Sequence, residues 1–426
     1  MTGIRYFKDL LPCGLRLVTV ETPHLHSAMV SVYVRVGSRH ETKANNGVSH
    51  ALEHLFFRGS ARYPDTVAMN ARVEAVGGNL NGITSRDLSY YFTPSHPDGV
   101  GVALDVLGDL LTRPMLTRLE LEKEIILEEM LDEVDEHGRD VDVENLSKSQ
   151  RFGDHSLGLK IAGTLKSVRG LKLSQVKAHY QRHYVAGNMV VAVAGKVTRR
   201  QVIDLATKAF KHVKAGPPVS EDPPPPPPKG PRLDFVRDEQ SQTSFRLSFP
   251  TVPEVHADFH ALSALRRVLD DGLSSRLPFN VVEKRGLAYS VGATIEAFHD
   301  AGSFEIDGAA APAKVADTVR EILKTIDTLR AGKISSEEMK RVRVRYRMAV
   351  ESQQDVPGDL LGWFAGEELF RPPKSFATRC REVEGLKIAD LVRVAKLYFR
   401  PERLLAVAVG PRECERALRR AIRSWG

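Results

Sequence analysis

Cysteines and long apolar runs are the features that this sequence of 426 residues has least of. It contains three cysteines, Cys13, Cys380 and Cys414, which lie far apart along the chain. They form neither a CxxC pair nor a dense framework, which excludes the disulfide-rich secreted class. No stretch is long and apolar enough to span a bilayer, and the first residues lack the apolar core of a signal peptide. We therefore expect a cytoplasmic protein with no membrane partner.

The chain also lacks any motif that would give its positive charge a role with nucleic acid. It has 61 Lys and Arg against 54 Asp and Glu, a net charge of +7. The two signs are interspersed, and no RRM, zinc-finger or helix-turn-helix pattern accompanies them. We expect no nucleic-acid partner. The alternative is a basic nucleic-acid-binding protein, which would bind DNA or RNA in a salt-sensitive way and would need no metal.

One compositional break divides the chain near its midpoint. Because 426 residues exceed the size of a typical single core, two domains are expected. Residues 216–231 read GPPVSEDPPPPPPKGP, and consecutive prolines form a semi-rigid extended spacer. A proline-rich ligand for an SH3-like partner is the alternative. The sequence predicts domains at 1–215 and 232–426, joined by the linker 216–231.

The two halves repeat one order of predicted elements. Each begins with two strands and one helix and later carries two longer helices. Strands and helices mix without strict βαβ alternation, so we predict a duplicated α+β unit with a mainly antiparallel or mixed sheet and helices on one face. The predicted segments are 15–20, 28–34, 103–111 and 119–134 in the first half and 232–236, 244–249, 259–269, 316–329 and 337–350 in the second.

A possible metal-binding helix lies between the first two strands and the longer helices. Residues 50–54 read HALEH, and residues four apart lie on one helix face, so His50 and His54 can bind one ion. Glu53 precedes the second histidine, as in the H-x-x-E-H zinc-peptidase pattern. The pairs His179/His183 and His256/His260 have the same spacing but no such glutamate, and we interpret them as surface or packing histidines.

A catalytic zinc needs a third protein ligand and an open position. The acidic segment 119–130 contains Glu122 and Glu129, which are seven residues apart and therefore share a helix face. One of them can bind the metal while the other supports it. The alternative is that this segment is a solvated acidic helix face.

Together these motifs resemble the pitrilysin and insulinase type of metallopeptidase, especially the two-subunit branch with the mitochondrial processing peptidase beta subunit and its bacterial relatives. The resemblance implies one zinc per chain, held by His50, His54 and Glu129, with Glu122 as accessory glutamate. The segment 77–84, GGNLNGIT, is similar to the edge strand that lines the family's substrate cleft, where Asn81 would bind substrate. It also implies two related domains that close like a clam, in a bacterial cytoplasmic protein.

The second half departs from the family pattern at one position. It carries Tyr289, which the resemblance makes an oxyanion donor, but the expected arginine seven residues earlier is Val282. Arg285 lies four residues before Tyr289, a spacing that does not match the seven residues of the family pattern. When the two halves are aligned, Lys340 and Arg347 occupy the positions of Glu122 and Glu129. They place positive charge where a metal would need anions, so we expect no zinc in the second half. A related, zinc-free subunit that supplied the arginine would explain Val282, and a homodimer is the alternative.

These observations predict a zinc endopeptidase that hydrolyses unfolded peptides or extended protein segments. Glu53 would be the general base for a water activated by zinc. The alternative from a different class is a non-catalytic or weakly active assembly subunit of a related hetero-oligomer, which Val282 favours.

Overall fold

The computed structural model describes residues 3–425, and these residues fold into two units that each take segments from both halves of the sequence. Unit 1 contains the residues up to Leu131, together with Leu159–Asp222 and Val350–Ser375. Unit 2 contains Asp132–Gly158, Pro223–Ala349 and the residues from Phe376. Within the described part of the chain, no helix has the length and apolarity needed to cross a membrane.

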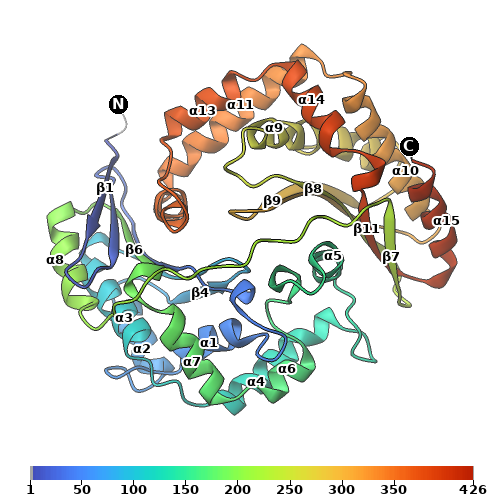
Figure 1. Cartoon of the computed structure of the whole chain (residues 1–426). Helices are drawn as coiled ribbons and strands as arrows, with labels where there is room; N and C mark the ends of the chain where they lie inside the picture. Colours follow the sequence, from blue (N-terminus) through green and yellow to red (C-terminus); the bar gives the residue numbers. More distant parts are fainter. Residues whose placement is uncertain (1–2, 426) are drawn as a thin grey trace. The chain divides into compact units, whose positions relative to one another are not determined.

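Unit 1 is built on a six-stranded mixed sheet with the order β1-β2-β6-β3-β5-β4. Strands β2 and β6 are parallel, and the other neighbours are antiparallel. Helices α1, α2, α3 and α7 lie along one side of this sheet (Figure 1). The elements of unit 1 are β1 Arg5–Leu10, β2 Arg16–Glu21, β3 Ala28–Val34, α1 Val48–Phe56, α2 Thr66–Glu74, β4 Asn81–Thr84, β5 Ser89–Ser95, α3 Val100–Thr112, α4 Leu119–Glu129, α6 Leu165–Gly170, α7 Leu173–His183, β6 Met189–Gly195, α8 Arg199–Ala209 and α12 Pro357–Leu361.

Unit 2 repeats this topology in a five-stranded sheet with the order β7-β11-β8-β10-β9. Unit 1 has one additional edge strand, β1, which is antiparallel to β2. Apart from β1, the first strand of each unit pairs in parallel with the last, and the second, fourth and third strands follow. This shared order confirms the prediction of two related α+β units with mixed sheets. The elements of unit 2 are α5 Val143–Phe152, β7 Arg232–Arg237, β8 Thr243–Thr251, α9 Phe259–Leu269, β9 Ser290–Ala297, β10 Gly302–Ala310, α10 Val315–Arg330, α13 Phe376–Glu384, α14 Ile388–Tyr398, β11 Leu405–Gly410 and α15 Arg412–Arg423, with α11 Ser336–Ser352 running into the segment assigned to unit 1.

A segment from the second half of the sequence covers the free face of the unit 1 sheet. The even-numbered residues of β3 point into the core beneath the sheet, as strand alternation requires. On β1, Tyr6 stacks on Phe364 at 4.7 Å between ring centroids. The Arg16 guanidinium donates to the Glu368 carbonyl at 2.5 Å. Residues 350–375 therefore complete unit 1 although they come late in the chain.

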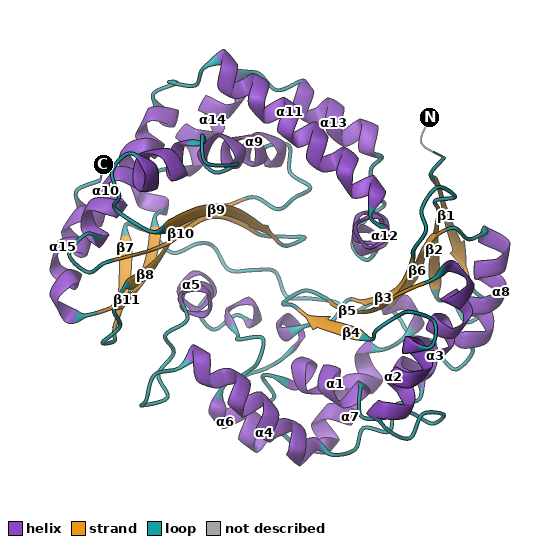
Figure 2. Cartoon of the chain, turned by 180° about the vertical axis from the view of Figure 1, so that it is seen from behind, coloured by secondary structure: helices purple, strands orange, loops and turns teal. Residues whose placement is uncertain are grey.

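Unit 2 receives the reciprocal segment from the first half. Helix α5 lies on the side of the sheet opposite to α9 (Figure 2). Its Lys148 side chain is 2% exposed and donates to the buried Glu305 carboxylate at 2.5 Å. Ser147 and Ser248 share a hydroxyl hydrogen bond of 3.0 Å, and Gln150 donates to the Ala406 carbonyl at 2.9 Å. Polar side chains thus attach α5 to strands that are distant in sequence.

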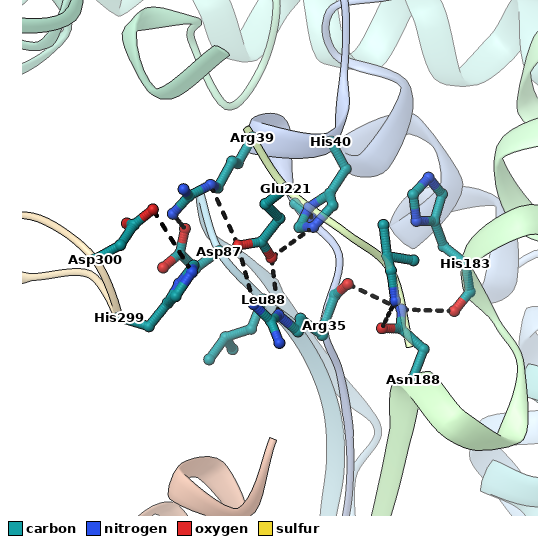
Figure 3. Close-up of polar contacts among 12 residues, drawn as sticks. Arg35, Arg39, His40, Asp87, Leu88, His183, Asn188, Glu221, His299 and Asp300 are labelled. Atoms are coloured by element: carbon teal, nitrogen blue, oxygen red, sulfur yellow. Dashed lines mark hydrogen bonds and ion pairs between the residues drawn. The ribbon is translucent and has the colours of Figure 1, made fainter. Parts of the chain in front are cut away.

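The carboxylate of Glu221, in the proline-rich segment, contacts several residues of unit 1. Glu221 accepts two hydrogen bonds from the Arg35 guanidinium, at 2.8 and 3.1 Å. His40 Nε2 lies 3.0 Å from the same carboxylate, and Arg39 Nε lies 3.5 Å from it (Figure 3). Arg39 also donates to the Asp222 carbonyl at 3.2 Å. Residues 221 and 222 are therefore fixed to the end of β3 and the turn after it.

We expect Lys148→Met to destabilise unit 2 by about 3 kcal/mol, because it removes a buried cation from Glu305 and leaves Arg246 as the remaining cation at that carboxylate. Urea unfolding in a Trp363→Phe background measures this, since Trp425 in unit 2 is then the remaining tryptophan. The control is Arg320→Ala, which removes an exposed i,i+3 ion pair with Asp317 and should cost about 0.2–1 kcal/mol. Equal effects of the two substitutions would contradict a role for Lys148 as an anchor.

Candidate metal centre

The N-terminus of α1 is held by a buried carboxylate. Glu41 is 5% exposed and accepts hydrogen bonds from the backbone N–H groups of Gly47 at 2.7 Å and Ser49 at 2.8 Å. Asn46 Nδ2 donates to it at 2.8 Å. Burial raises the pKa of Glu41, and these hydrogen bonds oppose the increase. A carboxylate at this position satisfies free N–H groups of the first turn and complements the helix dipole.

Two further contacts fix where α1 begins. Gly47 has a φ of 93°, and a Cβ atom there would lie 2.6 Å from the Ala162 carbonyl oxygen, so a side chain has no room. The Ser49 hydroxyl lies 3.0 Å from His179 Nε2 on α7. The helix that carries the HALEH motif is therefore held by a loop and by a neighbouring helix.

The structure brings together the three residues that were predicted from the sequence as metal ligands. His50 Nε2 and His54 Nε2 are 3.3 Å apart on one face of α1. Glu129, the last residue of α4, places Oε2 3.8 Å from His50 Nε2 and 3.7 Å from His54 Nε2. Within residues 3–425 these residues form the one group of His, Cys, Asp or Glu whose three ligand atoms all lie within 4.8 Å of one another.

This arrangement fits a tetrahedral zinc ion. Tetrahedral bonds of about 2.0–2.1 Å separate two ligand atoms by about 3.3 Å, close to the three distances observed. Burial, and next the neighbouring His54, lower the pKa of His50 to about 4, so its imidazole is in the neutral form that binds metals. Glu129 is an anion at a helix C-terminus, which is unfavourable unless a cation is close. The donor set therefore matches zinc in spacing and in charge.

An outer layer of polar groups supports only one of the two histidines. Glu122 has no exposed surface, and its Oε2 lies 3.2 Å from His54 Nδ1. Arg58 donates to both oxygens of Glu122, with Nη2 3.2 Å from Oε2. Nδ1 of His50, in contrast, is buried without a hydrogen-bond partner in the part of the chain that the structure describes. The carboxylate thus directs Nε2 of His54 toward the site, as metal-binding histidines require.

Glu53 lies beside the ligands and faces β4. The Thr84 hydroxyl donates a hydrogen bond to Glu53 Oε2. Gly82 permits this approach, because a Cβ atom there would lie 2.9 Å from both Glu53 Cγ and the Phe57 ring. Burial raises the pKa of Glu53, whereas the Thr84 hydrogen bond acts to lower it. The edge strand therefore orients the Glu53 carboxylate.

The other residues predicted for the site lie outside the group of three predicted ligands or in the other unit. Asn81 begins β4, the edge strand of its sheet, but its side chain alternates to the face opposite Gly82 and Thr84 and donates to the Asn79 carbonyl at 3.1 Å. Tyr289 precedes β9 in unit 2, and its side chain is 89% exposed.

The position expected to hold an arginine has an apolar environment. Val282 packs against the hydrophobic core of unit 2. Arg285 forms an ion pair with Glu321 at 3.3 Å. Of the other histidine pairs, His179 and His183 are buried, and His260 lies 2.9 Å from Glu382.

Several supporting residues were not found from the sequence. These are Glu41, Arg58 and Thr84, which act through hydrogen bonds to α1, Glu122 and Glu53. Arg58 lies four residues after the HALEH motif and Thr84 lies within GGNLNGIT, so proximity to a motif was an available signal. Glu41 lies outside both, and no spacing rule connects it with residues 47–49.

Comparisons with known proteins agree with this geometry. The model of the insulinase family, peptidase family M16, matches residues 16–165, and that of the peptidase M16 inactive domain matches residues 170–346. A Mycobacterium tuberculosis protein named an uncharacterized zinc protease is 30% identical over 427 residues, 98% of this chain and 96% of the relative. The mitochondrial-processing peptidase subunit beta of Dictyostelium discoideum is 27% identical over 417 residues, 93% of this chain and 87% of the relative.

The fold recurs in solved structures. The crystal structure of a protease from Helicobacter pylori superposes with a TM-score of 0.87 at 23% identity, covering 96% of this chain and 100% of the other. The family models and the full-length relatives confirm the resemblance drawn from the motifs. This chain belongs to the insulinase family of peptidases, peptidase family M16.

Proposed function

We propose that this protein is a zinc-dependent endopeptidase that hydrolyses peptide bonds in unfolded peptides or extended protein segments in the bacterial cytoplasm. The observation that carries the proposal is the convergence of His50, His54 and Glu129, with Glu53 beside them. Three protein ligands leave a fourth position open, as catalytic rather than structural zinc sites do. Zinc held there would supply Lewis acidity, which lowers the pKa of water and polarises a carbonyl oxygen.

Glu53 is the general base in this proposal. Its carboxylate accepts a proton from the water that attacks the scissile carbonyl carbon. It then delivers that proton to the nitrogen of the leaving amine, so the group returns to its initial state. The Thr84 hydroxyl keeps one carboxylate oxygen in place. A buried carboxylate with a raised pKa is suited to hold the proton between the two transfers.

The exposed edge of β4 is the basis for the class of substrate that we propose. An extended peptide can pair with an exposed sheet edge through main-chain hydrogen bonds, which selects unfolded segments over folded proteins. Asn81 begins this strand and is our candidate for binding the substrate main chain. We assign Tyr289 of the second unit as a hydrogen-bond donor to the oxyanion that develops on the scissile carbonyl.

A second candidate function is a zinc-binding assembly subunit with little or no turnover. Val282 favours it, because the arginine expected there is missing and the position is apolar. The same observation supports a partner: a related, zinc-free subunit would supply the missing arginine, and a homodimer is the alternative. The Dictyostelium relative is named as one subunit of a peptidase.

We expect Glu53→Gln to retain one zinc per chain while cleavage of an unstructured peptide library falls by about 10²–10⁴-fold, because the amide cannot accept the proton. Metal analysis and cleavage assays with and without a chelator measure the two properties. Unchanged turnover would show that Glu53 is not the base. Absence of both zinc and cleavage in the unaltered protein would reject the proposed function.

We expect Glu129→Gln to lose most of its zinc on dialysis, because an uncharged amide is a poor zinc ligand. Glu128→Gln is the matched control, since the neighbouring residue is exposed and lies outside the ligand group. Full zinc occupancy in the Glu129 variant, measured by elemental analysis, would reject its role as ligand.

If a partner supplies the missing arginine, the purified chain should bind zinc but cleave peptides only weakly. Light scattering gives its mass, and the peptide library gives its activity. A fully active homodimer would remove the reason to invoke a second kind of chain.

A further inference from the structure

Arg58 connects the two helices that carry the metal-binding residues. It lies two residues after the end of α1, and its backbone N–H donates to the Leu55 carbonyl at 3.2 Å. Its guanidinium reaches α4 and donates through Nε and Nη2 to the two oxygens of Glu122. A two-pronged contact of this kind restrains direction as well as distance, which a single ammonium cannot do.

Glu122 requires this cation. Its side chain has no exposed surface, while the Arg58 side chain is 27% exposed. His54 also contacts Glu122, and it is neutral when it binds a metal through Nε2. Without Arg58, the buried carboxylate would lose its positively charged partner, and such a charge cannot keep its position at low cost. The hydrogen bond that orients His54 therefore depends on Arg58.

The same contact bears on the second helix. Glu122 and Glu129 are seven residues apart on α4, which places them about 20° apart around the helix and about 10 Å apart along it. Fixing Glu122 against α1 thus sets the rotation of α4 that directs Glu129 toward His50 and His54. One arginine contributes to the position of a ligand on each helix.

We infer that Arg58 is a positioning residue of the metal centre, which holds His54 in its metal-binding orientation through Glu122 and sets the rotation of α4 that presents Glu129. This inference rests on the proposed zinc site. It distinguishes Arg58 from an ordinary structural arginine, because it assigns to Arg58 an effect on metal affinity in addition to any effect on stability.

The chain offers a close structural control. Arg113 lies directly after the end of α3, as Arg58 lies two residues after the end of α1, and it pairs with the buried carboxylate of Asp109 on α3. The exposed fractions are similar, 35% for Arg113 and 2% for Asp109, against 27% and 0% for Arg58 and Glu122. Neither residue of the control pair belongs to the metal group. Removing either arginine leaves a buried carboxylate in unit 1, but only one of the two contacts a proposed ligand.

The experiment measures zinc affinity of the purified full chain by competition with a chromophoric chelator. We expect Arg58→Met to weaken zinc binding about 10–100-fold, the range for loss of outer-layer support. Arg58→Lys should be intermediate, because it keeps the charge and loses the two-pronged geometry. Arg113→Met should keep the affinity of the unaltered chain. In Arg58→Met/Glu122→Gln, the effect should not exceed that of Glu122→Gln alone, since Arg58 acts through that carboxylate.

The visible absorption of bound Co²⁺ gives a readout of ligand geometry that does not depend on catalysis, and it should change in the Arg58 and Glu122 variants but not in Arg113→Met. Unchanged zinc affinity in Arg58→Met, or an equal loss in Arg113→Met, would overturn the inference. If Arg58→Met does not fold, Arg58→Lys decides on the same criterion. Failure of the unaltered chain to bind zinc would instead reject the proposed function, and the inference with it.

Discussion

The metal centre depends on the buried carboxylate of Glu122, which lies between His54 and Arg58. His54 belongs to α1, Glu122 to α4, and Arg58 to the exit from α1, so the three side chains join two separate segments of unit 1. A carboxylate with no exposed surface is costly unless its charge and hydrogen-bonding capacity are satisfied. The contacts that satisfy the charge and the hydrogen bonds of Glu122 also restrain how α1 and α4 lie against each other. In this arrangement Glu129 lies within 3.8 Å of both histidines.

Helix α1 carries residues of the proposed site and is restrained by contacts along its length. Its N-terminus is restrained by Glu41, its buried face packs in the core, and its other face carries His50, Glu53 and His54. The ligand atoms of the proposed zinc site are 3.3–3.8 Å apart, a spacing that tolerates little movement, and the short helix α1 has contacts at its beginning, middle and end. The edge strand adds a further restraint, because Gly82 and Thr84 bring β4 against Glu53.

The two units share a strand order, but they use the surfaces of α1 and α9 differently. Both helices pack one face into the core of their own unit. The remaining face of α1 carries His50, Glu53 and His54, whereas α9 carries His260, Arg266 and Arg267 outside its core face. The exchange of segments is a second common feature, since α5 joins unit 2 and residues 350–375 join unit 1. Neither unit is formed from a continuous half of the chain, so removing one half would also take elements from the other unit.

Local pattern in the sequence determined the first two strands of each repeated half, the helices α3, α4, α9, α10 and α11, the duplication and the pairing of His50 with His54, because periodicity and spacing are read directly from neighbouring residues. The seven-residue interval between Glu122 and Glu129 showed that they share a helix face. Only the tertiary structure decided which histidine each carboxylate meets, that Arg58 and Thr84 support Glu122 and Glu53, and that Glu41 caps α1. It also decided the exchange of α5 and residues 350–375 between units. These contacts join residues distant along the chain, and local spacing carries no information about which distant side chains meet.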